Sequence, residues 1–146
     1  MADYKHNDDI ADIDPRITDI KAAWDWIKVG IEEILLEQPQ LTFTPENIYS
    51  ECKNGSALLW TTDEGFIISS TLVDPFNREE TFLVWIAWAK KRGGNCVVKH
   101  FPFFQRKAKE AGYKYIEVRT PVEAMNKYLT SQGWDLNTTI YKRGLK

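Results

Sequence analysis

The sequence predicts a single α/β domain built on a mixed central sheet with helices on both faces. Its 146 residues are close to the size of one domain, and 43% of them are hydrophobic, which is enough for a core. The apolar pattern changes between helical and strand periods in the order α-α-β-β-β-α-β-α-β. No repeat or linker interrupts this order, so we expect one unit over residues 15–146, after residues 1–14 that form an acidic arm or a weak edge strand.

Two helices open the predicted domain. Asp14 and Pro15 offer an N-cap and a first-turn proline, and apolar residues then follow at spacings of three and four as far as Leu36. The apolar positions of this first helix are Ile17, Ile20, Trp24, Ile27, Ile31 and Ile34. A second cap and proline at residues 44–47 predict a short helix, which Asn54-Gly55 closes.

Three strands follow, and the last of them is central. Residues 57–62 and 66–73 are rich in strand-forming types, and the three residues between them have the length of a hairpin loop. Residues 80–89 are apolar on both faces, which is typical of a strand covered on both sides. Trp85 and Trp88 should point to opposite faces of this strand, because side chains alternate along it.

The remainder of the chain alternates helices and strands. Apolar residues recur at helical spacing over residues 97–111, and Pro102 means that this helix either bends there or begins there. Residues 113–119 alternate as a strand, and residues 120–123, Thr-Pro-Val-Glu, supply the cap, proline and capping-box glutamate of another helix. Residues 134–142 are expected to form a last strand.

Composition and cysteine spacing exclude several classes of protein. The formal net charge is only −2, and the longest candidate membrane segment, residues 81–89, is far shorter than the ~20 residues that a spanning helix needs. Cys52 and Cys96 lie far apart and, together with His6 and His100, show no metal-binding spacing. We therefore expect a cytoplasmic protein with inert thiols, no bound metal and no membrane contact.

Positive charge is concentrated in residues 90–114. This window has eight basic residues and one acid, Glu110, and so carries +7 against −9 for the remainder. The basic residues are Lys90, Lys91, Arg92, Lys99, Arg106, Lys107, Lys109 and Lys114. The window would attract a phosphate-bearing ligand or an acidic partner, unless its charges only form a solvated helix face. Nucleic acid is not expected as a partner, because Phe101, Phe103 and Phe104 fit a core helix better.

The turn after the central strand is the best candidate for an anion site. Residues 91–96 read Lys-Arg-Gly-Gly-Asn-Cys and connect a buried strand to a helix. The first N–H groups of a helix are unpaired and lie at the positive end of its dipole, so they can hold a phosphate, and glycine lets a ligand approach closely. Since Gly-Gly is also a common turn, the alternative is a turn without a ligand.

Two motifs end predicted helices: residues 108–113, Ala-Lys-Glu-Ala-Gly-Tyr, and residues 128–134, Tyr-Leu-Thr-Ser-Gln-Gly-Trp. These motifs and the order of elements resemble those of the GNAT (general N-acetyltransferase) superfamily. The resemblance covers nearly the whole chain and implies a GNAT-like fold with acetyl-CoA as cofactor. The Trp-rich central strand, the Arg-Gly-Gly turn and the proline in the next helix resemble most the short GNAT-like proteins of tailed bacteriophages.

The resemblance also implies roles for particular residues. The cofactor would be bound by Lys91, Arg92, Gly93, Gly94, Asn95 and Cys96. Glu80 or its neighbour Glu79 would take a proton from the amine, Tyr128 would protonate the departing thiolate, and a backbone N–H of the central strand would stabilise the oxyanion. Leu129 stands where the family's tyrosine usually falls, so Tyr128 should point about 100° away around the helix and turnover should be slow.

The resemblance leaves two functions open. The first is an N-acetyltransferase with a weakened site, which transfers acetyl from acetyl-CoA to an amine of a small molecule or a protein. The second is a catalytically silent GNAT-fold protein of a bacteriophage, which acts as a virion or assembly component with other virion proteins as partners. In that second case the protein would be found in the host cytoplasm or in the virion.

Overall fold

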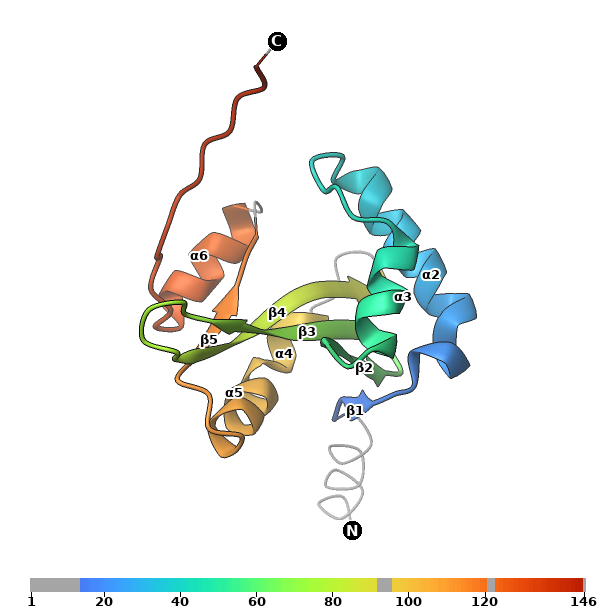
Figure 1. The fold of residues 1–146 in the computed structure, drawn as a ribbon, viewed down its shortest axis with the longest axis horizontal. Helices are drawn as coiled ribbons and strands as arrows, with labels where there is room; N and C mark the ends of the chain where they lie inside the picture. Colours follow the sequence, from blue (N-terminus) through green and yellow to red (C-terminus); the bar gives the residue numbers. More distant parts are fainter. Residues whose placement is uncertain (1–13, 92–95, 121–122, 146) are drawn as a thin grey trace.

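A five-stranded mixed sheet with helices on both faces forms the core of the protein (Figure 1). The computed structural model describes residues 14–91, 96–120 and 123–145. The predicted fold class is therefore confirmed. The predicted acidic arm over residues 1–14 lies outside the described residues except for Asp14.

The sheet is an antiparallel meander with one parallel strand at its edge. Its strands are β1 (Arg16–Ile17), β2 (Ala57–Thr62), β3 (Gly65–Val73), β4 (Glu80–Ala89) and β5 (Tyr115–Val118), in that spatial order. The first four strands pair antiparallel with their neighbours, and β5 pairs parallel with β4. The predicted hairpin and central strand are confirmed, because β-rich runs bounded by turn residues specify both locally.

Two helices, α2 (Ile20–Glu37) and α3 (Pro45–Lys53), cover one face of the sheet (Figure 1). The buried side chains of α2 that join this core are Ile20, Ala23, Ile27, Ile31 and Ile34. They pack against Leu59, Phe66, Ile68 and Ile86 of the sheet. The predicted apolar stripe of the first helix thus faces the core from Ile20 onward, as its spacing of three and four requires, with Trp24 partly buried against it. Its first predicted position is wrong, because Ile17 lies in β1 and is 62% exposed.

The other face is covered by α4 (Cys96–Lys99) and α5 (Phe101–Glu110). Phe103 and Phe104 of α5 pack against Trp60, Ile67 and Phe82 of the sheet. The sequence left open whether the helix bends at Pro102 or begins there. It begins there: His100 separates α4 from α5, and the proline lies in the first turn of α5. A proline in the first turn costs little, because its missing N–H would have no helical partner.

The first helix starts later than its sequence predicts. Asp19 is its N-cap and accepts a hydrogen bond of 2.9 Å from the backbone N–H of Lys21. The expected cap at Asp14 is wrong, because Arg16 and Ile17 pair with β2 as the short strand β1. Asp14 and Asp19 are both suitable N-cap residues. The helix begins at the second of them because the residues between them pair with β2.

The expected last strand over residues 134–142 is also wrong. After α6 (Glu123–Ser131), residues 134–145 belong to no strand or helix, and the chain runs away from the domain (Figure 1). Leu136, Ile140, Tyr141 and Leu145 are all exposed. An alternating pattern becomes a strand only where another strand pairs with it, and no described strand does so here.

Candidate functional site

The parallel strands β4 and β5 separate halfway along β4. Their pairing runs from Thr81 and Tyr115 to Val84 and Val118, and no described residue continues it. β4 goes on to Ala89 while still paired with β3 on its other side. The second half of β4 therefore has one edge that no described strand occupies, and this edge leads to the predicted anion-binding turn.

A β-bulge lies where the two strands separate. Ser69 pairs with Val84 and Ile68 with Ile86, so Trp85 is an extra residue in β4. Trp85 and Trp88 both pack against the core under α2 and α3. The expectation that they point to opposite faces is wrong, because one extra residue shifts the alternation of the strand by one position.

Beyond the bulge, the main chain of Ala87 and Ala89 faces the unpaired edge. The N–H of Lys90 donates a 2.8 Å hydrogen bond to the carbonyl of Glu64, on the β3 side of the strand. Hydrogen-bonding direction alternates along a strand, so Trp88 faces β3 as well, and Ala87 and Ala89 face away from it. Ala87 is exposed. Its small side chain leaves room for an extended ligand to pair along this edge.

Aromatic contacts hold this half of β4 in place. The ring of Trp85 lies 5.7 Å from that of Phe43, which precedes α3. Trp88 stacks on buried Phe66, with centroids 5.5 Å apart and planes inclined by 25°. Such ring pairs add about 0.5–1.5 kcal/mol each to the energy of burial. These contacts therefore fix the second half of β4 against the core, so its unpaired edge has a defined position.

The predicted anion-binding turn is only partly described. Lys91 is exposed at its beginning, and Cys96 is the first residue of α4. Arg92, Gly93, Gly94 and Asn95 lie outside the described residues. The structure thus confirms that a strand precedes these residues and a helix follows them, and their role as ligands of a cofactor stays a prediction.

Glu64 connects both sides of this turn to the β2–β3 hairpin. Its carbonyl accepts the N–H of Lys90 at the end of β4, and its carboxylate forms an ion pair with Lys99 of α4. Both charged side chains are partly exposed, so the ion pair contributes at most about 1 kcal/mol. Lys99 therefore adds less to the positive field of the basic window than its formal charge implies.

The predicted base, Glu80, lies at the far end of β4. It is exposed, and its carbonyl accepts a 2.9 Å hydrogen bond from the N–H of Lys114. Five residues separate it from Trp85, which is about 16 Å along an extended strand. Its neighbour Glu79 accepts a 3.0 Å hydrogen bond from the Asn77 side chain. Neither carboxylate lies where the strands separate.

The predicted acid, Tyr128, lies on α6 beside Leu129. Tyr128 is 36% exposed and Leu129 only 8%. No hydrogen bond or ring contact in the described part of the chain joins the side chains of Glu80 and Tyr128. Their roles as base and acid stay a prediction.

His100 is a buried polar residue that the sequence pattern did not single out. It is 3% exposed, and its Nε2 has no hydrogen-bond partner among the described residues. Burial, and then the neighbouring Lys99, lowers the pKa of His100 below 6.5, so the imidazole is neutral at pH 7. Its burial could have been predicted from its position between Val98 and Phe101, because both are apolar residues of the predicted helix.

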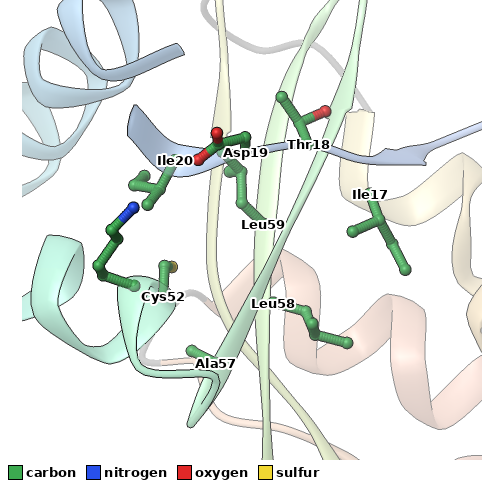
Figure 2. Close-up of a pocket in the computed structure, with 9 residues that line it drawn as sticks. Ile17, Thr18, Asp19, Ile20, Cys52, Ala57, Leu58 and Leu59 are labelled. Atoms are coloured by element: carbon green, nitrogen blue, oxygen red, sulfur yellow. The ribbon is translucent and has the colours of Figure 1, made fainter. Parts of the chain in front are cut away.

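A cavity of about 250 Å³ lies at the opposite edge of the sheet, where α2 begins and α3 ends (Figure 2). It is lined by Ile17, Thr18, Asp19, Ile20, Cys52, Lys53, Ala57, Leu58 and Leu59. Burial, and then the charge of Glu51, raises the pKa of the Cys52 thiol to about 11. Because only a thiolate is a strong nucleophile, Cys52 does not make this cavity a catalytic site.

The described residues contain neither a cluster of metal ligands nor a membrane-spanning helix. In residues 14–91, 96–120 and 123–145, no three side chains of His, Cys, Asp or Glu gather to hold a metal ion. None of the helices in these same residues is both long and apolar enough to cross a membrane.

Solved acetyltransferase structures share this fold. A ribosomal-protein-alanine N-acetyltransferase from Brucella melitensis biovar Abortus 2308 matches with a TM-score of 0.66 and 13% identity, over 91% of this chain and 100% of that chain. An aminoglycoside acetyltransferase from an uncultured soil metagenomic sample, in complex with sisomicin, matches with a TM-score of 0.66 and 9% identity, over 93% of this chain and 98% of that one.

These likenesses establish a class of fold. No family model matches the sequence, and no curated protein is significantly similar to it. At such low identity the structural matches show the fold alone, which is that of the GNAT acetyltransferases. The fold that the element order predicted is thus confirmed.

Proposed function

We propose that this protein binds acetyl-CoA along the unpaired edge of β4 and transfers the acetyl group to an amine. The observation that carries this proposal is the separation of β4 from β5 beyond Val84 and Val118, with a bulge at Trp85. The separation exposes main-chain groups of a central strand and leads directly into a basic turn. The fold shared with acetyltransferases supports the same chemistry.

The residues at this edge fit the cofactor. The pantetheine part of acetyl-CoA is an extended chain with amide groups, which can pair with the N–H and C=O of Ala87 and Ala89 as a strand would. Its pyrophosphate is anionic and would lie near Lys91 and the N–H groups of residues 92–95. Acetyl-CoA supplies an activated thioester, in which the bond between carbon and sulfur breaks when the amine attacks.

The side chains and main chain around β4 would assist in three ways. The N–H of Ala87 would donate to the oxygen on which negative charge develops. Glu80 would take the proton from the amine through water, whereas Tyr128, the acid that the resemblance implies, would contribute little to protonating the thiolate because its side chain is exposed. General acid and base catalysis typically contributes ~10² to 10⁴-fold each, so the distance of Glu80 from the bulge and the exposure of Tyr128 support a slow enzyme.

A titration of the full chain with acetyl-CoA tests the binding edge. The substitution Ala87→Pro removes the N–H that faces this edge without removing a hydrogen bond to β3. We expect it to weaken binding by ~10-fold or more, whereas Ala87→Gly, which keeps the N–H, should bind as the parent does. A parent protein that does not bind, or an Ala87→Pro variant with unchanged affinity, contradicts the proposal.

A charge reversal tests the turn. Arg92→Glu should weaken acetyl-CoA binding by ~10-fold or more, because a charge-assisted contact with phosphate is replaced by repulsion. Lys109→Glu, the same change of charge on the exposed surface of α5, is the matched control and should have little effect. Equal losses in both variants would show that only the general field of the basic window attracts the cofactor.

A catalytically silent component of a bacteriophage particle is the second candidate function. The observation that favours silence is the position of Glu80, about 16 Å along the strand from the bulge at Trp85 where β4 and β5 separate. Release of free thiol from acetyl-CoA, measured with a panel of small amines and amino-terminal peptides, separates the two candidates. Turnover with any amine supports the enzyme, and no turnover with all of them supports the silent protein.

A further inference from the structure

The chain beyond α6 forms an extended arm, residues 135–145, which we call the C-terminal arm (Figure 1). Trp134 fixes its beginning: the N–H of Trp134 donates a 3.0 Å hydrogen bond to the carbonyl of Leu129, and its ring lies 5.2 Å from that of Phe101. After Trp134, no main-chain hydrogen bond joins the arm to any other described residue. The arm therefore starts from a fixed point, and no strand among the described residues pairs with it.

The arm is apolar on both sides. Leu136 is 69% exposed, Ile140 82%, Tyr141 92% and Leu145 93%. In an extended chain, successive side chains point to opposite sides, so Ile140 and Tyr141 present apolar surface in both directions. This pattern suits a strand that is covered on both faces, as the central sheet of this protein is.

The outer edge of β5 lacks a neighbouring strand among the described residues. β5 is the last strand of the sheet, and β4 is the only strand in the described part of the chain that pairs with it. Tyr115 is 57% exposed, and Ile116 and Val118 are only partly buried. An edge strand with unpaired N–H and C=O groups is a template for a further strand.

We propose that the protein forms a two-fold dimer in which the C-terminal arm of each copy adds a strand to the outer edge of β5 in the other copy. Each chain has one arm that can be donated and one strand edge that can accept an arm. A reciprocal exchange between two copies pairs both arms and both edges, so no further copy can be added. The arm spans about 35 Å when extended, against about 13 Å for the four residues of β5, so it is long enough to reach a neighbour.

The buried area is sufficient for a stable dimer. The four apolar side chains of one arm bury roughly 100 Å² each, and the surfaces that receive them bury a similar area. For two arms the total is about 1,600 Å², which is the standard size of a specific interface. A second copy of this chain is the occupant that we propose, because it supplies both a donor arm and an acceptor edge and the estimated area matches that of a stable dimer.

Molar mass in solution tests the dimer. We expect the full chain at 1–100 µM to run at twice the monomer mass in sedimentation velocity, and Ile140→Asp to run as a folded monomer with an unchanged circular dichroism spectrum. Leu36→Asp is the matched control: Leu36 is 84% exposed on α2, which is not part of the proposed interface, and its variant should remain a dimer. A parent monomer at 100 µM overturns the proposal, as does a dimer that survives Ile140→Asp.

Hydrogen exchange tests whether the contact is a strand pairing between copies. The amides of residues 115–118 and 138–142 should gain at least ~10-fold protection between monomeric and dimeric concentrations of the parent, and should lose it in Ile140→Asp. Protection of the same amides in a monomer would show that the arm pairs with β5 of its own chain. A dimer whose arm stays unprotected would place the interface elsewhere. Either result overturns the proposal.

Discussion

Tyr128 and Leu129 are neighbours on α6 and lie in opposite environments. The side chain of Leu129 is 8% exposed, whereas that of Tyr128 is 36% exposed. Adjacent residues on a helix are separated by about 100° around its axis, so only one of the two can face the domain. The apolar side chain occupies the inner position, and the only hydroxyl of the pair faces outward.

This arrangement predicts that Tyr128 is dispensable for structure and nearly dispensable for turnover. Tyr128→Phe should change any acetyl transfer rate by less than ~3-fold and leave stability within about 0.5 kcal/mol of the parent, because the site is exposed. Leu129→Ala, by contrast, should lower the free energy of unfolding by about 2–3 kcal/mol. Urea unfolding and a thiol-release assay measure both effects. A loss of ~100-fold in rate for Tyr128→Phe would show that the tyrosine does act as the acid.

Gly30 allows α2 to approach the aromatic layer on β3 and β4. A Cβ atom at this position would lie 2.5 Å from Phe66 Cε2 and 2.8 Å from Trp88 Cδ2. Gly30→Ala gains about 1 kcal/mol in helix propensity, but overpacking a buried contact costs about 1–3 kcal/mol. Since Phe66 is fully buried and cannot move easily, we expect a net loss of about 1 kcal/mol or more.

The neighbouring Val29 provides the control for this substitution. Val29 is 55% exposed, so Val29→Ala should change stability by no more than about 0.5 kcal/mol. Thermal unfolding of both variants decides the matter. A Gly30→Ala protein that is more stable than the parent would mean that the two rings shift without strain.

The sequence pattern predicted the strands whose formation depends on neighbouring residues in the chain. The β2–β3 hairpin and β4 follow from residue type, alternation and turn residues, and all three strands form within one residue of the expected bounds. The bulge at Trp85 could not be predicted, because it depends on the register between β3 and β4. The last strand was expected from the pattern at residues 134–142, but a strand also requires a partner, which the sequence pattern does not supply.

The candidate site was predictable to a similar extent. A turn at residues 91–96 is predicted from a buried strand, two glycines and basic residues. The elements on both sides form as expected, whereas residues 92–95 lie outside the described residues. The unpaired edge at Ala87 was not identified, because it arises where the pairing with β5 stops at Val84. The distance of Glu80 from that edge likewise depends on where two strands part, which is a property of the assembled sheet.

The buried imidazole of His100 predicts a loss of stability in mild acid. Its pKa in the folded protein is lowered below 6.5, first by burial and then by Lys99, so below pH 6.5 the unfolded chain binds a proton that the folded chain resists. The contribution of neutral His100 is therefore complete above about pH 6.5 and decreases as the pH falls toward the folded pKa. Urea unfolding at pH 7.5 and pH 5.5 measures this difference.

Substitution identifies the titrating group. His100→Gln should reduce the loss of stability between pH 7.5 and pH 5.5, even if the variant is less stable at both. His6→Gln removes the other histidine of the chain and should leave the loss unchanged. Identical pH dependence in the parent and the His100→Gln protein would assign the effect to carboxylates instead.

The Cys52 thiol predicts a slow reaction with alkylating reagents. Burial, and to a lesser degree the charge of Glu51, raises its pKa to about 11, against an ordinary value of 9.0. At pH 8 this lowers the thiolate fraction about 100-fold, and alkylation depends on that fraction. Measured with iodoacetamide in a Cys96→Ser background, Cys52 should therefore react about 100-fold more slowly than a cysteine in a short peptide.

Glu51→Gln removes the lesser cause of the raised pKa and should raise the reaction rate only slightly, whereas urea, which removes the burial, should restore the rate of the peptide. A native thiol that already reacts at the peptide rate would show that the cavity beside α3 opens freely to solvent.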